Sequence, residues 1–373
     1  MQIPLFKIYS DENDIASVTE IIRSGMYWAI GPLVSELEKR INEYLGSHYC
    51  VVFNSGTSAL HALMLAYNLG NGDEIIVPSF TFIATANSAL FVHAKPIFAD
   101  IESQTFGLDP GDVLERISKK TKAIIPVHYG GCPAQISALR DIANDHNILL
   151  IEDAAESFGS TYHGKMTGTF GDSAMLSFCQ NKVITTGEGG GIVTDSKEIY
   201  EKLLLIRSHG RLDDKDYFSN AKAGDYVSLG YNTRLSNIQA ALGVAQLAKV
   251  EKIILKRETV ARYYIENLKE IPEIILPQVF PNTRNVFQLF SIRVKQGLRD
   301  KLIDFLKSKG ISSKVYFSPV HLTHFYKDVL QHRVHLPKTE LISNEILSLP
   351  IYPTMTEEEQ NYVVDTVKTF FGS

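Results

Sequence analysis

Short runs rich in Val, Ile and Phe alternate with amphipathic stretches of helical length along the first half of the chain. Because two parallel strands need a long crossover between them, this alternation is typical of a parallel sheet with helices on its faces. The sequence predicts an α/β fold with a mostly parallel seven-stranded sheet. We expect its strands over residues 49–53, 74–77, 95–99, 123–127, 149–152, 174–178 and 191–194.

The pattern changes near residue 246, where a long charged helical stretch begins with EKIILKRETVARYYIENLKE. A weaker strand pattern, FQLFSIRV, and a second helical pattern, RDKLIDFLKSKG, follow it. We therefore expect a large α/β domain, with the N-terminal segment, over residues 1–248 and a smaller α+β domain over residues 249–373.

Charge and composition exclude several classes of partner. The 373 residues carry a formal net charge of -5, and no basic run favours nucleic acid. The first twenty residues lack the pattern of a signal peptide, and the apolar runs are too short to span a membrane. Three widely spaced cysteines, Cys50, Cys132 and Cys179, suit a reducing compartment. We expect a cytoplasmic protein with no nucleic-acid or membrane partner.

Lys182 stands in an unusual place for a lysine. In SFCQNKVITTGEGGG, residues 177–191, it follows an apolar strand and precedes a glycine-rich turn. A lysine that forms a Schiff base must be unprotonated for part of its cycle, which requires partial burial near the carboxyl edge of a sheet. A surface lysine at a strand end is the ordinary alternative, so position alone makes Lys182 only a candidate.

Asp153 ends the apolar strand in ILLIEDAAES, residues 148–157. An acid at the carboxyl end of a parallel strand points into the crevice where such sheets bind ligands, although Asp153 alone could equally cap the next segment. A carboxylate that faces the ring nitrogen of pyridoxal phosphate keeps this nitrogen protonated, so the ring can accept electrons. Lys182 and Asp153 together therefore predict a pyridoxal phosphate enzyme in which both are catalytic.

Gly56, Thr57 and Ser58 stand between a strand and a helix in NSGTSALHALMLA, residues 54–66. Backbone N–H groups and hydroxyls at a helix N-terminus can bind a phosphate, but the same residues are also ordinary helix caps. His128 and Cys132 in PVHYGGCP are two potential metal ligands. Without a second pair they fall short of a zinc site, so we expect no metal.

These segments, in this order, resemble the sugar aminotransferases of the DegT/DnrJ/EryC1/StrS family, which have fold type I among pyridoxal phosphate enzymes. The resemblance covers nearly the whole chain. It begins at SGMYWAIGP, residues 24–32, and continues through GTSAL, VPSFTFIATAN, EDAAES, SFCQNK, TTGEGG, RSHGR, LGYNTRLSNIQAALG, SPVHLTHFY and LSLPIYP.

The resemblance implies roles around the cofactor ring. Lys182 matches the lysine that forms the Schiff base, and Asp153 matches the partner of the ring nitrogen. Glu156 stands where many members have Gln near the ring hydroxyl, and Cys179 stands where several have His or Tyr. Phe82 falls where the family stacks an aromatic ring on the pyridine, although it could be a packing residue.

The resemblance also implies a phosphate site and a dimer. Gly56, Thr57, Ser58 and Ser177 match the residues that bind the cofactor phosphate. Asn232 matches an asparagine that reaches the phosphate in the neighbouring subunit, which implies a homodimer with shared active sites. A simple turn residue is the alternative for Asn232.

The implied reaction moves the amino group of L-glutamate onto a nucleotide-linked keto sugar, and the motifs favour C4 of a 4-keto-6-deoxyhexose. The alternatives are a C3 keto-sugar or cyclitol aminotransferase, a sugar dehydratase of the same family, and a non-catalytic regulatory relative. The dehydratases replace the Schiff-base lysine with histidine, so Lys182 opposes that alternative.

Overall fold

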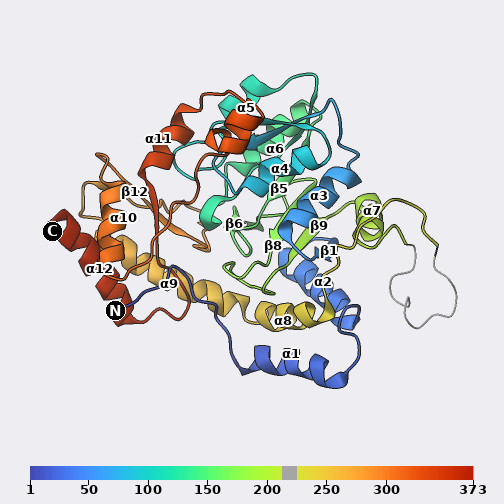
Figure 1. The fold of residues 1–373 in the computed structure, drawn as a ribbon, viewed down its shortest axis with the longest axis horizontal. Helices are drawn as coiled ribbons and strands as arrows, with labels where there is room; N and C mark the ends of the chain where they lie inside the picture. Colours follow the sequence, from blue (N-terminus) through green and yellow to red (C-terminus); the bar gives the residue numbers. More distant parts are fainter. Residues whose placement is uncertain (212–224, 373) are drawn as a thin grey trace.

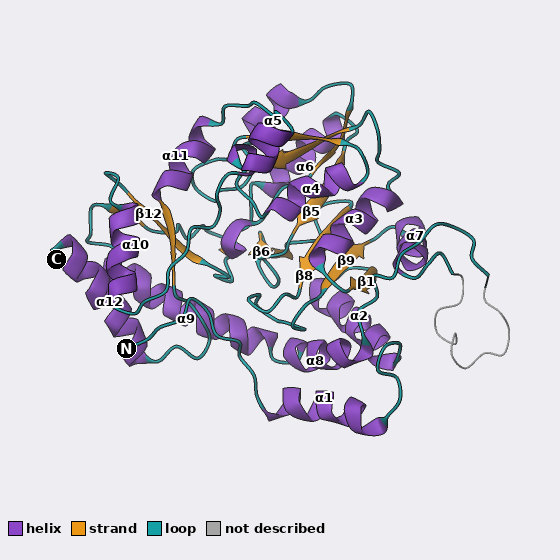
Figure 2. Cartoon of the chain, viewed as in Figure 1, coloured by secondary structure: helices purple, strands orange, loops and turns teal. Residues whose placement is uncertain are grey.

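A seven-stranded sheet forms the centre of the computed structural model, which describes residues 1–211 and 225–372. The strand order is β1-β9-β8-β5-β4-β2-β3, with helices on both faces (Figure 1 and Figure 2). Of these seven strands, β9 alone is antiparallel to its neighbours. The expected α/β fold with a mostly parallel sheet is confirmed. The strands are β1 (Tyr49–Phe53), β2 (Glu74–Pro78), β3 (Lys95–Ala99), β4 (Thr121–Ile124), β5 (Leu149–Asp153), β8 (Ser173–Ser177) and β9 (Gly190–Thr194).

Alternate residues of each strand pack against opposite layers of helices, because successive side chains of a strand point to opposite faces. Val51 and Phe53 of β1 join a buried cluster with α3, α4 and α7, whereas Cys50 and Val52 join another with α2 and α8. This two-sided burial explains why the strands are nearly continuous apolar runs. The helices around the sheet are α2 (Pro32–Leu45), α3 (Gly56–Ala66), α4 (Ile83–Phe91), α5 (Pro110–Arg116), α6 (Ile136–Asp145), α7 (Lys197–Arg207) and α8 (Asn237–Leu247), and α1 (Glu12–Ser24) packs against α8.

The C-terminal part has its own buried cluster around a small antiparallel sheet in the order β10-β12-β13. Ile3, from the start of the chain, belongs to this cluster and forms a β-bridge with Ile311. The division at 248/249 falls between α8 and α9 and stays a prediction. The elements of this part are α9 (Val250–Leu268), β10 (Ile274–Ile275), β11 (Thr283–Arg284), β12 (Phe290–Val294), α10 (Arg299–Ser308), α11 (Pro337–Glu345), β13 (Ile346–Leu349) and α12 (Glu357–Phe371).

Short elements complete the described chain. Strand β11 pairs with β6 (Thr161–Tyr162), which also pairs with β7 (Lys165–Met166). This third sheet joins the C-terminal part to the loops that follow β5. Single-turn helices lie at 129–131, 320–322 and 325–329.

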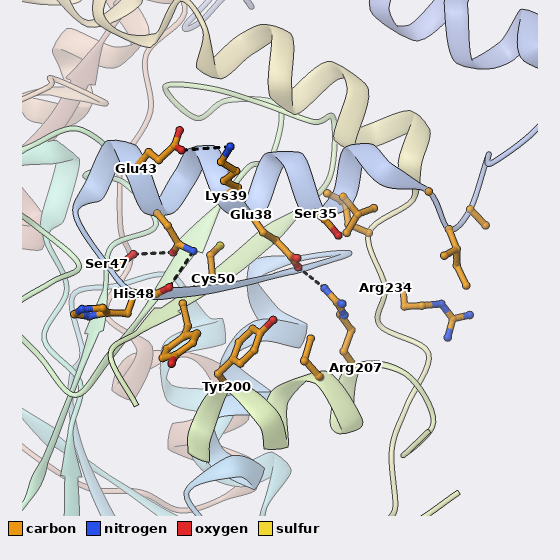
Figure 3. Close-up of a pocket in the computed structure, with 18 of the residues that line it drawn as sticks. Ser35, Glu38, Lys39, Glu43, Ser47, His48, Cys50, Tyr200, Arg207 and Arg234 are labelled. Carbon is orange, nitrogen blue, oxygen red and sulfur yellow. Dashed lines mark hydrogen bonds and ion pairs between the residues drawn. The ribbon is translucent and has the colours of Figure 1, made fainter. Parts of the chain in front are cut away.

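A groove of about 800 Å³ lies between α2 and α7, beside β1 (Figure 3). An ion pair connects the two helices within the groove, with Arg207 Nη1 of α7 2.5 Å from Glu38 Oε1 of α2. Arg207 also donates a hydrogen bond to the carbonyl of Val52 at 3.1 Å. Tyr49 and Tyr200 stack at one end, with ring centroids 4.8 Å apart.

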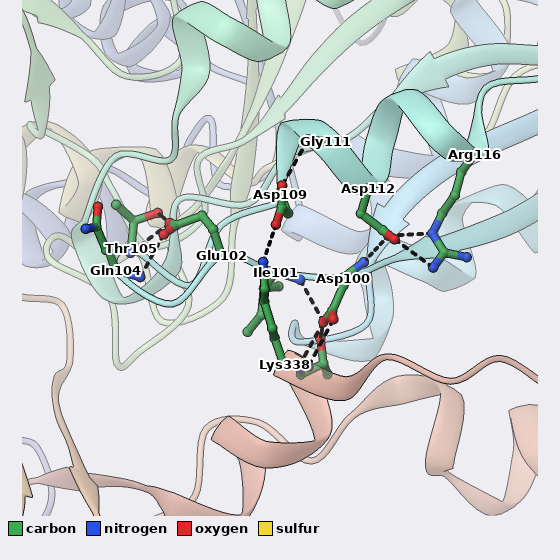
Figure 4. Close-up of polar contacts among 11 residues, drawn as sticks. Asp100, Ile101, Glu102, Gln104, Thr105, Asp109, Gly111, Asp112, Arg116 and Lys338 are labelled. Carbon is green, nitrogen blue, oxygen red and sulfur yellow. Dashed lines mark hydrogen bonds and ion pairs between the residues drawn. The ribbon is translucent and has the colours of Figure 1, made fainter.

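The start of α11 docks on the loop after β3 mainly through the carboxylate of Asp100 (Figure 4). Asp100 accepts hydrogen bonds from the N–H of Lys338, and from both the N–H and the hydroxyl of Thr339, at 2.7 to 3.0 Å. Lys338 also forms an ion pair with Asp109. These contacts hold a segment of the C-terminal part against the large sheet.

Strands β1 and β3 have the expected boundaries, and the boundaries of the other five strands differ from the expected ones by one to three residues. The largest difference is at β4, which spans residues 121–124 rather than 123–127. Pro126 has no N–H to continue the ladder, although Val127 still forms an isolated bridge with Asp153. Among the described residues, no helix is long and apolar enough to cross a membrane.

Candidate active site

A cavity of about 410 Å³ opens where five of the parallel strands end. Parallel strands bring their carboxyl ends to one edge of a sheet, so the segments that follow β1, β2, β4, β5 and β8 meet there. Seven of the nine predicted site residues line this cavity, and Ser58 contacts the side chain of Ser55, which also lines it. The cavity is lined by Ser55, Gly56, Thr57, Thr81, Phe82, Thr85, Val127, Asp153, Glu156, Ser177, Cys179, Asn181, Lys182, Glu188, Lys314, Tyr316 and Phe317, among others.

Asp153 is the last residue of β5 and is 4% exposed. Its carboxylate accepts a hydrogen bond from the Thr85 hydroxyl at 2.7 Å and one from the Ala155 N–H at 3.1 Å. Burial raises the pKa of the Asp153 carboxyl, and these hydrogen bonds and the charge of Lys182 counteract that effect. A buried carboxylate with so few donors favours a cationic partner within the cavity.

Lys182 lies in the loop that follows β8, with its side chain 14% exposed. Its N–H donates to the carbonyl of Cys179 at 3.0 Å, which closes a tight turn and directs the side chain back over the sheet edge. Its Nζ lies 3.4 Å from Oε1 of Glu156, while Oε2 of Glu156 accepts the Gly130 N–H at 2.8 Å. The structure thus brings an amine and two carboxylates, Asp153 and Glu156, into one cavity.

The N-terminus of α3 faces the same cavity. Ser55 is the N-cap and accepts the N–H of Ser58 at 3.1 Å, while the two hydroxyls lie 2.9 Å apart. The N–H groups of Gly56 and Thr57, in the first turn, have no acceptor within the helix. Ser177, at the end of β8, lies across from them, and a Cβ at position 56 would come 3.5 Å from its Cβ. This arrangement suits a phosphate.

Aromatic residues form the outer wall of the cavity. Phe82 is 61% exposed, a high value for a large apolar ring that lines a cavity. Its ring lies 6.4 Å from that of Phe317, which comes from the C-terminal part together with Lys314 and Tyr316. The Lys314 ammonium sits 4.9 Å from the Tyr316 ring. The space between this wall and Asp153 can hold a flat ring.

Asn232 is the predicted site residue that lies outside the cavity. It is exposed and forms an isolated β-bridge with Ser208, on the segment that leads into α8. An exposed position away from its own cavity is what a residue that acts in a neighbouring subunit requires. The trans contact therefore stays a prediction.

His128 and Cys132, the two potential metal ligands, have other partners, and the Cys132 thiol lies 3.8 Å from the carbonyl oxygen of Pro133. His128 and Glu152 are both fully buried, and the imidazole Nε2 lies 2.9 Å from the Glu152 carboxylate. The other ring nitrogen accepts the N–H of Ala134 at 3.0 Å, which places the proton on Nε2. Glu152 also accepts three backbone N–H groups of the loop at 168–171, so the pair anchors this loop beneath Asp153.

The sequence interpretation missed several cavity residues. Thr85 could have been found, because it follows Phe82 by three positions and therefore shares its face of the helix α4. Lys314, Tyr316 and Phe317 had no local signal, since the long-range fold of the chain brings them to the sheet edge. The larger groove between α2 and α7 contains none of the predicted site residues.

A mostly parallel sheet that collects a lysine, an aspartate and a helix N-terminus at its carboxyl edge defines the class of fold type I transferases. The family model described as the DegT/DnrJ/EryC1/StrS aminotransferase family matches residues 9–368, so the chain belongs to that family. The predicted family and enzyme class, a sugar aminotransferase, are thereby confirmed.

Individual relatives match this chain over nearly its full length. The chain is 36% identical to the GDP-perosamine synthase of Caulobacter vibrioides, over 95% of this chain and 94% of that one. Helicobacter pylori PseC, an aminotransferase involved in pseudoaminic acid biosynthesis, superposes with a TM-score of 0.93 and 29% identity over 100% of both chains. The putative sugar aminotransferase Spr1654 of Streptococcus pneumoniae, solved in a PLP-form, has a TM-score of 0.90 and 27% identity over 100% and 99% of the two chains.

Proposed function

We propose that this chain transfers the amino group of L-glutamate to C4 of a nucleotide-linked 4-keto-6-deoxyhexose, with Lys182 as the reacting amine. The observation that carries the proposal is the placement of Lys182 and Asp153 in one cavity at the carboxyl edge of the sheet. The C4 position is supported by the relative named GDP-perosamine synthase, since perosamine is a 4-amino-4,6-dideoxyhexose.

Pyridoxal phosphate is the cofactor of this chain, as its family and the Spr1654 relative, solved in PLP-form and PMP-form, indicate. The residues of the cavity fit it in three respects. The first turn of α3 presents free N–H groups for a phosphate, Phe82 presents an exposed ring for stacking, and Asp153 presents a buried carboxylate with room for a cation. When bound, this cofactor supplies an electron sink for the carbanion formed at the α-carbon of the amino donor.

Residues of the chain would hold the cofactor at four points. Gly56, Thr57, Ser58 and Ser177 would bind its phosphate. Asp153 would hold the proton on its ring nitrogen, because an ionised carboxylate in a buried site strongly favours a protonated partner. Glu156, whose second oxygen is fixed by Gly130, would face the ring hydroxyl, and Phe82 would cover one face of the ring.

Lys182 would move the proton. Its Nζ is partly buried and flexible, which lets it take the α-proton of the amino donor as a base and return it as an acid. Glu156 Oε1 lies 3.4 Å from Nζ and would help to hold this amine in place between the two transfers. The same group would act in both halves of the reaction, first on L-glutamate and then, in reverse, on the keto sugar.

The substrates are anions, and Lys314 offers them a cation on the outer wall. Among the described residues, no carboxylate lies within 4 Å of its ammonium group in an ion pair. Asn232 would complete the site of a neighbouring subunit, so the active protein would be a homodimer. The three free cysteines and the nucleotide-linked substrate support a cytoplasmic location.

Product analysis tests the proposed function. The purified protein would receive pyridoxal phosphate, L-glutamate and, in separate reactions, GDP-, UDP- and dTDP-linked 4-keto-6-deoxyhexoses. We expect an amino sugar with nitrogen at C4, identified by NMR, from at least one of them, and the GDP-linked sugar is the first choice because of the named relative. Nitrogen at C3, or turnover of a cyclitol ketone alone, would contradict the proposal.

A further inference from the structure

Two buried hydroxyls stand in line behind Asp153, and the cofactor contacts described above do not use them. Thr81 and Thr85 are 2% and 1% exposed, and their Oγ1 atoms lie 2.9 Å apart. Thr85 Oγ1 lies 2.7 Å from Oδ2 of Asp153. Among the described residues, Thr85 supplies the one side-chain hydrogen bond that this carboxylate receives, and the Ala155 N–H supplies the other contact.

Hydrogen counting fixes the direction of this chain of hydroxyls. An ionised carboxylate only accepts, so the single proton of Thr85 must point to Asp153. The Thr85 oxygen is then left as the acceptor for the proton of Thr81. If Asp153 were protonated on Oδ2, it would donate to Thr85, and both hydroxyls would turn the other way. The direction Thr81 to Thr85 to Asp153 therefore requires an Oδ2 without a proton, a condition that the ionised carboxylate always meets.

We propose that Thr85, oriented by Thr81, is a positioning residue that keeps Asp153 ionised and aimed into the cavity, and thereby sets the affinity for the protonated ring of the cofactor. This inference rests on the proposed function. Polarisation along the chain strengthens the bond to the carboxylate, because each hydroxyl that accepts a hydrogen bond becomes a better donor.

The surroundings of Asp153 explain why its charge needs the hydrogen bond from Thr85. Burial raises the pKa of its carboxyl, and the nearby charge of Glu156 acts in the same direction. The bond from Thr85, the Ala155 N–H and the charge of Lys182 lower it. In the cofactor-free protein, the hydrogen bond from Thr85 comes first among the contacts that oppose the effect of burial on the Asp153 carboxyl.

Cofactor binding by conservative variants tests this inference without any measurement of turnover. Thr85→Val keeps the shape of the buried side chain and removes the hydroxyl, Thr85→Ser keeps the hydroxyl, and Thr81→Val removes only the outer one. Thr339→Val is the matched control, because buried Thr339 donates a bond of the same length, 2.7 Å, to buried Asp100, and neither residue lines the cavity. Equilibrium dialysis of pyridoxal phosphate at pH 7 and pH 9, with a melting curve for each variant, gives the readout.

We expect the variants to differ in their affinity for pyridoxal phosphate. Thr85→Val weakens the affinity for pyridoxal phosphate at pH 7 by about tenfold or more, as loss of a hydrogen bond to a charged group implies. This loss should shrink as the pH rises from 7 to 9, because a higher pH favours the ionised carboxyl of Asp153. Thr81→Val shows a smaller loss, Thr85→Ser binds almost normally, and Thr339→Val lowers the melting temperature without changing the affinity.

Two outcomes overturn the inference: an unchanged affinity in Thr85→Val, or an equal loss in Thr339→Val. If Thr85→Val does not fold, the comparison of Thr81→Val with Thr85→Ser decides, since only the first should weaken binding. A wild-type protein that binds no pyridoxal phosphate would instead contradict the proposed function itself, so the two failures are distinguishable.

Discussion

The cavity contains a lysine and carboxylates of opposite charge, and the lysine comes from the end of a different strand than the carboxylates. Lys182 comes from the loop after β8 and lies 3.4 Å from Glu156, whereas Asp153 ends β5 and is held by Thr85. The Lys182 side chain is 14% exposed, whereas Asp153 is 4% exposed and accepts hydrogen bonds from Thr85 and Ala155. This division suits one group that transfers protons and another that holds a constant charge.

Lys182→Ala should abolish both half-reactions and leave a folded protein. We expect the rate of amino transfer from L-glutamate to fall by on the order of 10³-fold or more, because the base and the attachment point for the cofactor are lost together. Single-turnover absorbance measurements would report the rate. Lys202→Ala, which removes a lysine paired with Glu198 on α7, is the control and should keep normal activity. Retained transfer in Lys182→Ala would refute the assignment.

Asp153→Asn should stabilise the cofactor-free protein at neutral pH while it weakens turnover. The pKa of the Asp153 carboxyl is raised by burial. Its contribution to stability is therefore fully present below the pKa of the unfolded chain and is lost as the pH rises through the raised value. The advantage of the variant in urea unfolding should grow from acidic to neutral pH. An advantage that is constant with pH would show that Asp153 does not titrate as described.

At the scale of elements, the sequence predicted the seven strands and the helices between them because their signal is local. Buried parallel strands are continuous apolar runs, and helices such as α6 show the amphipathic period. Strand ends were less predictable, since hydrogen-bond partners from other strands decide them, as at Pro126. The wall formed by residues 314–317 could not be predicted, because its approach to the sheet edge depends on how the C-terminal part docks.

Gly190→Ala should disturb the start of α3 and with it the phosphate site. A Cβ at this position of β9 would lie 2.5 Å from the backbone N of Gly56 and 2.5 Å from the carbonyl carbon of Ser55. We expect a loss of about 1–3 kcal/mol in the free energy of unfolding, with weaker pyridoxal phosphate binding.

The neighbouring Gly191→Ala is the control for this element. Its added Cβ would come no closer than 3.4 Å to the Phe178 ring, so both stability and binding should change less. Urea unfolding and cofactor titration of the two variants give the comparison. If Gly191→Ala were the more damaging, the contact between β9 and the start of α3 would not control the phosphate site.

At the scale of the whole molecule, Asn232 is the predicted site residue that lies away from the cavity of its own chain. The exposed segment that contains Asn232 also carries two exposed apolar residues, Leu229 and Tyr231. An exposed apolar segment of this kind suits an interface between subunits. The structure of one chain is therefore consistent with a site completed by a partner.

Mixed dimers test this arrangement. A dimer that combines one Lys182→Ala subunit with one Asn232→Ala subunit should regain up to about half of the wild-type activity, because one of its two sites then contains both native residues. Each homodimeric variant alone should be impaired. Affinity-tagged mixed dimers and a glutamate half-reaction assay would measure the recovery. No recovery in the mixed dimer would speak against sites shared between subunits.

The most direct test of the central claim is the absorbance spectrum of the purified protein with pyridoxal phosphate, recorded before and after L-glutamate is added. We expect a visible band from cofactor attached to Lys182. This band should be absent in Lys182→Ala and, in the wild-type protein, should give way to the shorter-wavelength band of the aminated cofactor. A protein that stays colourless would contradict the claim. A coloured protein that does not respond to L-glutamate would contradict the proposed amino donor.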